Sequence, residues 1–96
     1  MKLRQPTDFL ILEALEETGR NVATNLKAHT GKGRKNINTR LPMLADYGLV
    51  RKIGPKEQSG LYEITSKGEA ALAHRDEYDE VVDFEQLIED ETTSTG

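Results

Sequence analysis

The chain has 96 residues, which is enough for one small domain with a tail, and it contains no cysteine. A disulfide framework and a zinc site with cysteine ligands are therefore excluded, and we expect a reducing, cytoplasmic setting. The longest apolar run near the N-terminus, Phe9–Leu12, is too short for the core of a signal peptide or for a membrane span, so no membrane association is expected.

The net charge of −4 conceals a separation of charge along the chain. Residues 1–75 hold all thirteen basic residues and eight acidic ones, whereas residues 76–96 hold nine acidic residues and no basic one. The basic residues are densest within 20–57, where nine of them stand against two acids. A positive centre beside an acidic tail indicates a polyanionic partner, with ordinary surface patchiness as the alternative.

Residues 7–18 are predicted to form a first helix that Thr7 caps. Asp8 would then lie at the positive end of the helix dipole. The expected core side chains are Ile11, Leu12 and Leu15. Phe9 and Leu10 widen the apolar surface beyond this face, and they belong either to the core or to a dimer contact.

A helix-turn-helix pattern follows. A second helix is predicted over about 22–29, with Asn21 as its cap. After a glycine-containing turn over 30–33, a third helix is predicted over about 33–47. Two helices joined by a short turn with glycine are typical of the DNA-binding helix-turn-helix, in which the second helix reads the bases.

The third helix is defined by an apolar seam. Ile37, Leu41 and Leu44 are four and three residues apart, which places them on one helical face. A glycine stands at each end of the helix, where N-cap and C-terminal glycines are expected. Pro42 removes one helical hydrogen bond, but the seam continues through it. We therefore expect one helix, with a break near Leu41 as the alternative.

The face opposite the seam is cationic and polar, and we predict that it reads the DNA major groove. Its residues are Arg34, Lys35, Asn36, Asn38, Thr39 and Arg40, with Lys32 in the preceding turn. The helix dipole disfavours cations in the first turn, so the cations there suggest a functional site. Because arginine pairs with guanine and asparagine with adenine, Asn38 and Arg40 are expected to contact base edges, and Lys35 to contact phosphate. The alternative is an ordinary solvated helix face.

Two short strands are predicted at 49–53 and 61–64, joined by a polar turn that begins and ends with glycine. A hairpin directly after a helix-turn-helix is typical of a wing. The basic residues of this hairpin are Arg51, Lys52 and Lys56. They would place the wing, residues 51–62, on the DNA backbone or in the minor groove, with Lys56 on phosphate. A solvated edge hairpin protected by charge is the alternative.

Thr65 or Ser66 is predicted to cap a further helix that frays near Arg75. Beyond it, apolar residues recur at roughly helical spacing among nine acids: Tyr78, Val81, Val82, Phe84, Leu87 and Ile88. This segment is either a helix packed on the domain or on a second copy, or a disordered acidic tail that opposes DNA binding by repelling phosphate. Residues 91–96 are expected to be disordered.

Two motifs carry a resemblance: Leu41-x-x-Leu44-x-x-x-Gly48-Leu49-Val50 and Tyr62-x-Ile64-Thr65-x-x-Gly68-x-x-x-Leu72. With the order of the predicted elements, they resemble the winged helix-turn-helix superfamily over about 7–75. The whole is most similar to small winged-helix regulators of halophilic archaea that resemble a haloarchaeal phage repressor. The resemblance implies DNA binding and transcriptional regulation. It places Lys35, Asn36, Asn38, Thr39 and Arg40 on the reading face and Lys56 at the wing tip, while Pro42 departs from the broader pattern.

We therefore expect an α+β fold of the winged helix-turn-helix type, with a three-helix core, a two-stranded wing and a C-terminal helix. Residues 1–75 would form the DNA-binding domain, and residues 76–96 an acidic segment, part helical and part disordered. The expected function is sequence-specific binding of double-stranded DNA as a transcriptional repressor or regulator, by a homodimer. A winged-helix protein-interaction module with a basic face is the alternative.

Enzymatic chemistry and cofactors are not expected. His29 and His74 are the only histidines and form no ligand cluster with cysteine, and the Gly31–Gly33 stretch lacks the residues of a phosphate-binding loop. RNA binding is disfavoured because the chain has only five aromatic residues for base stacking. The sequence does not identify a small-molecule effector, an operator or the regulated genes.

Overall fold

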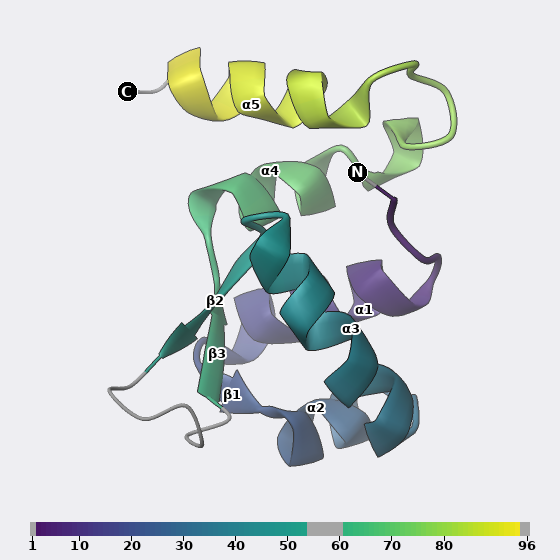
Figure 1. The fold of residues 1–96 in the computed structure, drawn as a ribbon, viewed down its shortest axis with the longest axis vertical. Coiled ribbons are helices and arrows are strands. Elements are labelled where there is room, and N and C mark those ends of the chain that lie inside the picture. Colours follow the sequence, from purple (N-terminus) through teal and green to yellow (C-terminus); the bar gives the residue numbers. More distant parts are fainter. Residues whose placement is uncertain (1, 54–60, 95–96) are drawn as a thin grey trace.

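The computed structural model describes residues 2–53 and 61–94 (Figure 1). Its class is α+β, as predicted. In chain order the elements are α1 (Thr7–Thr18), β1 (Asn21–Val22), α2 (Ala23–Thr30), α3 (Arg34–Asp46), β2 (Val50–Ile53), β3 (Leu61–Ile64), α4 (Ser66–Ala73), the 3-10 turn η2 (Arg75–Glu77) and α5 (Phe84–Ser94). None of the helices in the described part of the chain is long and apolar enough to cross a membrane.

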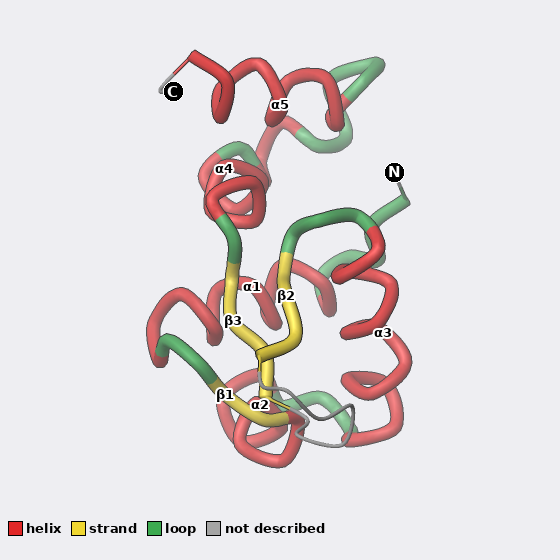
Figure 2. The backbone as a smooth tube through the Cα atoms, turned by 60° about the vertical axis from the view of Figure 1, so that its left-hand side comes forward, coloured by secondary structure: helices red, strands yellow, loops and turns green. Residues whose placement is uncertain are grey.

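Three short strands form one antiparallel sheet in the order β1-β3-β2 (Figure 2). The hairpin predicted from the sequence is confirmed, with Val50 opposite Ile64 at the open end of the ladder. Strand β1 was not predicted. Asn21, expected to cap α2, instead pairs with β3, and its side-chain amide donates to the Thr18 hydroxyl at 3.0 Å. Residues 54–60, which include Lys56, lie outside the described residues.

The seam of α3 forms the centre of the core. Ile37, Leu41 and Leu44 are each at most 1% exposed, and the helix runs unbroken through Pro42, as expected. The helix ends in a Schellman motif, in which Gly48 adopts φ +81°. The N–H of Leu49 donates to the Leu44 carbonyl at 3.0 Å, and that of Gly48 donates to the Ala45 carbonyl at the same distance. The chain thereby turns from α3 directly into β2.

The start of α1 differs from the expectation. Pro6 is the N-cap residue and no side chain caps the helix, so the prediction that Thr7 caps α1 is wrong. Thr7 is instead the first helical residue and is buried. The neighbouring Asp8 carboxylate accepts a hydrogen bond from the backbone N–H of Arg4 at 2.7 Å, which ties the preceding segment to the first turn.

The C-terminal elements pack on the rest of the fold. Thr65 caps α4: its hydroxyl accepts from the Gly68 N–H at 3.0 Å and donates to the Gly48 carbonyl at 2.6 Å. Helix α5 lies across α4, as Figures 1 and 2 both show, and Phe84 and Ile88 are buried in the core. Of the alternatives for this segment, the structure therefore shows a helix packed on the same chain, but that helix begins only at Phe84, and Val82 of the expected apolar stripe is exposed. The helix continues to Ser94, so the expectation of disorder from residue 91 is wrong as far as Ser94.

Of the two apolar residues of α1 that were expected either in the core or in a dimer contact, Phe9 is packed within the chain. Phe9 is 6% exposed, and its ring meets those of Tyr78 and Phe84 edge to face, at centroid distances of 5.8 and 6.3 Å. The rings of Tyr78 and Phe84 also meet edge to face, at 5.1 Å. This aromatic cluster joins α1 to the C-terminal segment, so Phe9 belongs to the core, whereas Leu10 is half-buried and lies outside the core cluster.

Candidate nucleic-acid interface

The outer face of α3 carries polar side chains with unused hydrogen-bonding capacity. Lys35, Asn36 and Asn38 are exposed, and none of these side chains is hydrogen-bonded or ion-paired to any residue in the described ranges. Thr39 is also exposed, and its hydroxyl donates to the backbone carbonyl of Lys35 at 2.8 Å. The predicted placement of these four residues on the outer face is confirmed, because the seam fixes the opposite face of the helix in the core.

The first turn of α3 is left open to an anion. Gly33 is the N-cap and has no side chain to pair with the free backbone N–H groups, and the first turn contains no acidic residue. Lys35 is exposed in this turn. Lys32, in the turn before, is half-buried, and its N–H donates to the Thr30 hydroxyl at 3.1 Å. The backbone of Arg34 begins α3, while its side chain lies outside what the structure describes.

Arg40 does not belong to this surface. Its side chain is 7% exposed, and its guanidinium lies against the fully buried carboxylate of Asp8, with Nε 2.8 Å from Oδ1 and Nη2 2.7 Å from Oδ2. The expectation that Arg40 lies on the outer face, free to contact a base edge, is therefore wrong. The hydrogen bonds that Arg40 donates to Asp8 raise the pKa of Arg40, so its charge is retained in spite of burial.

The spacing of the sequence already contained the signal for this burial. Residues 37, 40, 41 and 44 are the full i, i+3, i+4, i+7 set of a buried helical stripe. Arg40 therefore stands on the edge of the seam and is directed toward α1. The sequence predicts for Asp8 only an interaction with the helix dipole. A buried arginine requires an acidic partner, and Asp8 is that partner.

The two basic residues of the hairpin that the structure describes, Arg51 and Lys52, are exposed but do not lie on one surface. Arg51 and Lys52 are consecutive in β2, so their side chains leave opposite faces of the sheet. Arg51 stands directly opposite Glu63 of β3 and is ion-paired with it. Arg20 reaches the same carboxylate from the other side, with Nε 3.1 Å from Oε2. The two guanidinium groups hold the pKa of Glu63 below its usual range, with Arg51 contributing most.

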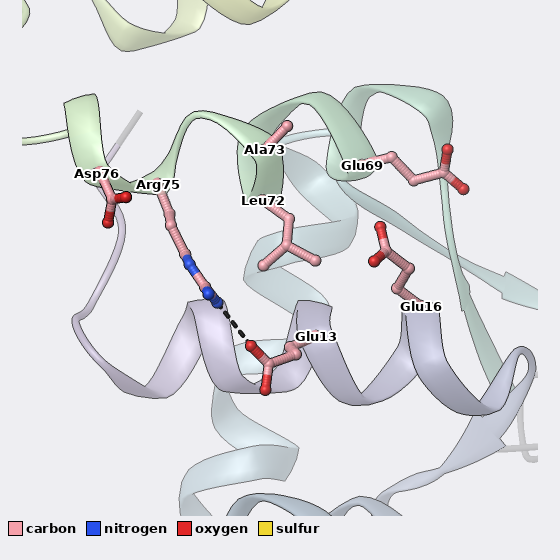
Figure 3. Close-up of a pocket in the computed structure, with 7 residues that line it drawn as sticks. All are labelled: Glu13, Glu16, Glu69, Leu72, Ala73, Arg75 and Asp76. Carbon is pink, nitrogen blue, oxygen red and sulfur yellow. Dashed lines mark hydrogen bonds and ion pairs between the residues drawn. The ribbon is translucent and has the colours of Figure 1, made fainter.

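A contrasting acidic surface lies between α1 and α4. A hollow of about 390 Å³ has four carboxylates among its lining residues, which Figure 3 shows as sticks. The lining residues are Glu13, Glu16, Glu69, Leu72, Ala73, Arg75 and Asp76. Arg75 donates to Glu13 at 2.6 Å, which raises the pKa of Arg75. The excess of carboxylates makes this part of the surface unfavourable for a polyanion.

Within the described ranges, no group of three or more histidine and acidic side chains is arranged to hold a metal ion. No protein-family model matches the chain, and neither a curated protein nor a solved structure is significantly similar to it. The features of the molecule that indicate a function are therefore the surface of α3 and the position of α3 between α2 and the hairpin.

Proposed function

We propose that the chain is a winged helix-turn-helix protein that binds double-stranded DNA and regulates transcription, in the simplest case as a repressor. The outer face of α3 supports this proposal most strongly. Lys35, Asn36 and Asn38 are exposed there without partners among the described residues, while the seam on the other face is fully packed. Side chains of these types read base edges and contact phosphates in the major groove.

The order of the elements supports the same proposal. Helices α2 and α3 are joined by residues 31–33, and Gly31 adopts φ +72° at the end of α2. The β2–β3 hairpin follows α3 directly in the chain, and Figure 1 shows both strands on one side of α3. This order of elements is the one expected of a helix-turn-helix with an adjoining wing, and it therefore supports the proposal.

We assign separate roles to the residues of this face. Asn38 lies outside the first turn and is the base-reading candidate, since an asparagine can pair with adenine through two hydrogen bonds. Lys35 lies in the first turn and is the phosphate-contacting candidate. Arg40 receives no base contact because its donors are engaged by Asp8. It holds α3 in place instead.

The test begins with selection of a cognate duplex from a random library, followed by titration of that duplex and of random DNA. Asn38→Ala should cost about 1–3 kcal/mol on the cognate duplex and almost nothing on random DNA, because one base-specific contact is lost. Lys35→Ala should weaken binding to both and lower the slope of log K against log salt by about 0.9. Gln86→Ala, an exposed change on α5, is the control.

Two results would overturn this proposal. If the wild-type protein binds no duplex even at low salt, the basic face serves another acidic partner, as in a protein-interaction module. If Asn38→Ala weakens cognate and random DNA equally, the assignment of base reading to Asn38 is wrong. A homodimer stays a prediction, and it would protect two half-sites with centres about 34–36 Å apart, or a multiple of that distance.

A further inference from the structure

Residues 2–4, which we name the N-terminal arm, belong to no helix or strand, yet all of their backbone polar groups are paired. The Tyr47 hydroxyl accepts from the Lys2 N–H at 3.3 Å and donates to the Lys2 carbonyl at 3.1 Å. The Tyr78 hydroxyl likewise accepts from the Leu3 N–H at 2.8 Å and donates to the Leu3 carbonyl at 3.3 Å. An irregular segment with this degree of pairing is held in one conformation.

The anchor continues into α1 and α3. The Arg4 N–H donates to the Asp8 carboxylate at 2.7 Å, and the Arg4 carbonyl accepts from the Asp8 N–H at 2.8 Å. Arg40 also donates to the Lys2 carbonyl, at 3.3 Å. The arm is thus fixed through its backbone to the same ion pair that orients α3.

The side chains of the arm alternate between the core and the solvent. Leu3 is 8% exposed and belongs to the hydrophobic core. Lys2 and Arg4 on either side of it are exposed, and neither side chain is ion-paired with a residue of the described ranges. The fold therefore places two cations at defined positions without using their charge internally. The conformational entropy of the arm backbone is lost when the protein folds, so it is not lost again when a ligand binds to the two cations.

The arm and the hairpin flank α3 from different sides. The arm contacts Arg40 and Tyr47 near the C-terminal end of the helix, and Figure 1 shows it on the right of the molecule, with the hairpin on the left. An α-helix is about 10–12 Å in diameter and the major groove is about 12 Å wide, so a helix in the groove fills it. Elements beside the helix then lie against the sugar–phosphate strands that form the groove walls.

The surface between the arm and α3 also provides room for a DNA strand. A hollow of about 450 Å³ opens there, lined by Lys2, Leu3, Arg4, Arg40, Met43 and Tyr78. Met43 is 39% exposed and is one of two large apolar side chains exposed in the described part of the chain. A hollow lined by an exposed thioether and by two exposed cations suits the apolar sugar and the charged phosphate of a nucleic acid backbone.

We propose that the N-terminal arm is a second phosphate-binding element, in which Lys2 and Arg4 contact the DNA strand beside α3 on the side away from the hairpin. The inference rests on the proposed function. It adds a contact that the sequence did not predict, because no periodic pattern marks an irregular segment whose position is decided by Tyr47 and Tyr78 from distant parts of the chain.

The experiment compares two double variants with the same change of charge. Lys2→Gln/Arg4→Gln removes both cations of the arm but keeps the backbone anchor, so the melting temperature should stay unchanged. Lys67→Gln/Arg75→Gln is the matched control, since both of its cations are paired with acids elsewhere on the surface. Binding of a random duplex and of the selected duplex is then measured across a salt series, with thermal melts of every variant.

The arm variant should lower the slope of log K against log salt by about 1.8, which corresponds to two phosphate contacts. It should weaken both duplexes by the same factor, and the control should leave the slope as it is in the wild type. A wild-type slope in the arm variant would overturn this inference and leave the proposed function intact. Equal losses in the two variants would also overturn it, because bulk charge would then account for both. Absence of duplex binding by the wild type would overturn both proposals.

Discussion

Arg40 of α3 and Asp8 of α1 form a bidentate ion pair inside the protein. The two hydrogen bonds are 2.8 and 2.7 Å long, and the side chains are 7% and 0% exposed. Because two hydrogen bonds join the guanidinium to the two oxygens of one carboxylate, the pair tolerates little rotation of one helix against the other. The direction in which Lys35 and Asn38 leave α3 therefore depends on a contact on the opposite flank of the helix.

Arg40→Ala should destabilise the protein by about 3–5 kcal/mol, because it leaves the Asp8 carboxylate buried without a counter-charge. Denaturant unfolding followed by circular dichroism measures this loss. The double variant Asp8→Asn/Arg40→Met, which removes both charges, approximately keeps both side-chain volumes and leaves an amide oxygen to accept from the Arg4 N–H, should recover part of the stability. Lys35→Ala, an exposed change on the same helix, should change the stability by less than about 0.5 kcal/mol. Wild-type stability of Arg40→Ala would contradict the structural role assigned to the pair.

Phe84→Ala should cost about 3–5 kcal/mol, because Phe84 is 5% exposed and its ring contacts two other aromatic rings. The exposed Gln86→Ala, two residues along α5, serves as the matched control and should be nearly neutral. Thermal melts of the two variants measure the difference. If Phe84→Ala melts like the control, α5 does not contribute to the core, and the C-terminal segment acts through its charge alone.

Gly68→Ala should be strongly destabilising because of a steric contact with the backbone. A Cβ at Gly68 would lie 2.1 Å from the Leu49 carbonyl oxygen and 2.7 Å from Cγ1 of Ile64. The first turn of α4 would have to move away from the sheet, at a cost of about 1–3 kcal/mol or more. For a domain of this size that corresponds to a lowering of the melting temperature by about 4–8 °C per kcal/mol.

Gly33→Ala is the control for this glycine, because a Cβ at Gly33 meets nothing within 4 Å. It should lower the free energy of unfolding by less than about 1 kcal/mol, because alanine is less favourable than glycine at an N-cap by about that amount. Equal melting temperatures for the two alanine variants would show that the close approach of α4 to Leu49 is not required.

Glu63 should make the stability depend on pH in the acidic range. Its pKa is lowered in the folded protein by Arg51 first and by Arg20 second, so folding favours the ionised form. The resulting stabilisation is fully present above the unfolded pKa of about 4.3 and is lost as the pH falls through the lower folded pKa. Glu63→Gln should remove this part of the pH dependence.

The measurement is denaturant unfolding at a series of pH values from neutral to strongly acidic, with the Glu63 titration followed by NMR. Arg51→Gln should raise the pKa of Glu63 more than Arg20→Gln does, because Arg51 is the larger cause of the shift. An unshifted titration of Glu63 in the wild type would show that the two ion pairs are not formed in solution.

Local patterns in the sequence determined most of the elements. The seam of Ile37, Leu41 and Leu44 predicted α3 and its buried face, since helical spacing alone decides which side chains share a face. The hairpin strands were also predicted correctly, and Thr65 is one of the two residues, with Ser66, that were expected to cap α4, because strand alternation and N-capping depend on a few consecutive residues. The exposed side chains at Lys35 and Asn38 followed from the same periodicity.

Only the tertiary structure decided which residues meet across the chain. Strand β1 has two residues, and its pairing with β3 exists only after distant segments come together. The burial of Arg40 required Asp8 from another helix, and the arm required Tyr47 and Tyr78, which are 45 and 75 residues away from their partners. Helical periodicity determines which face of a helix is buried. The partner of a buried charge or of an irregular backbone segment depends instead on contacts between distant segments, and no local pattern encodes these contacts.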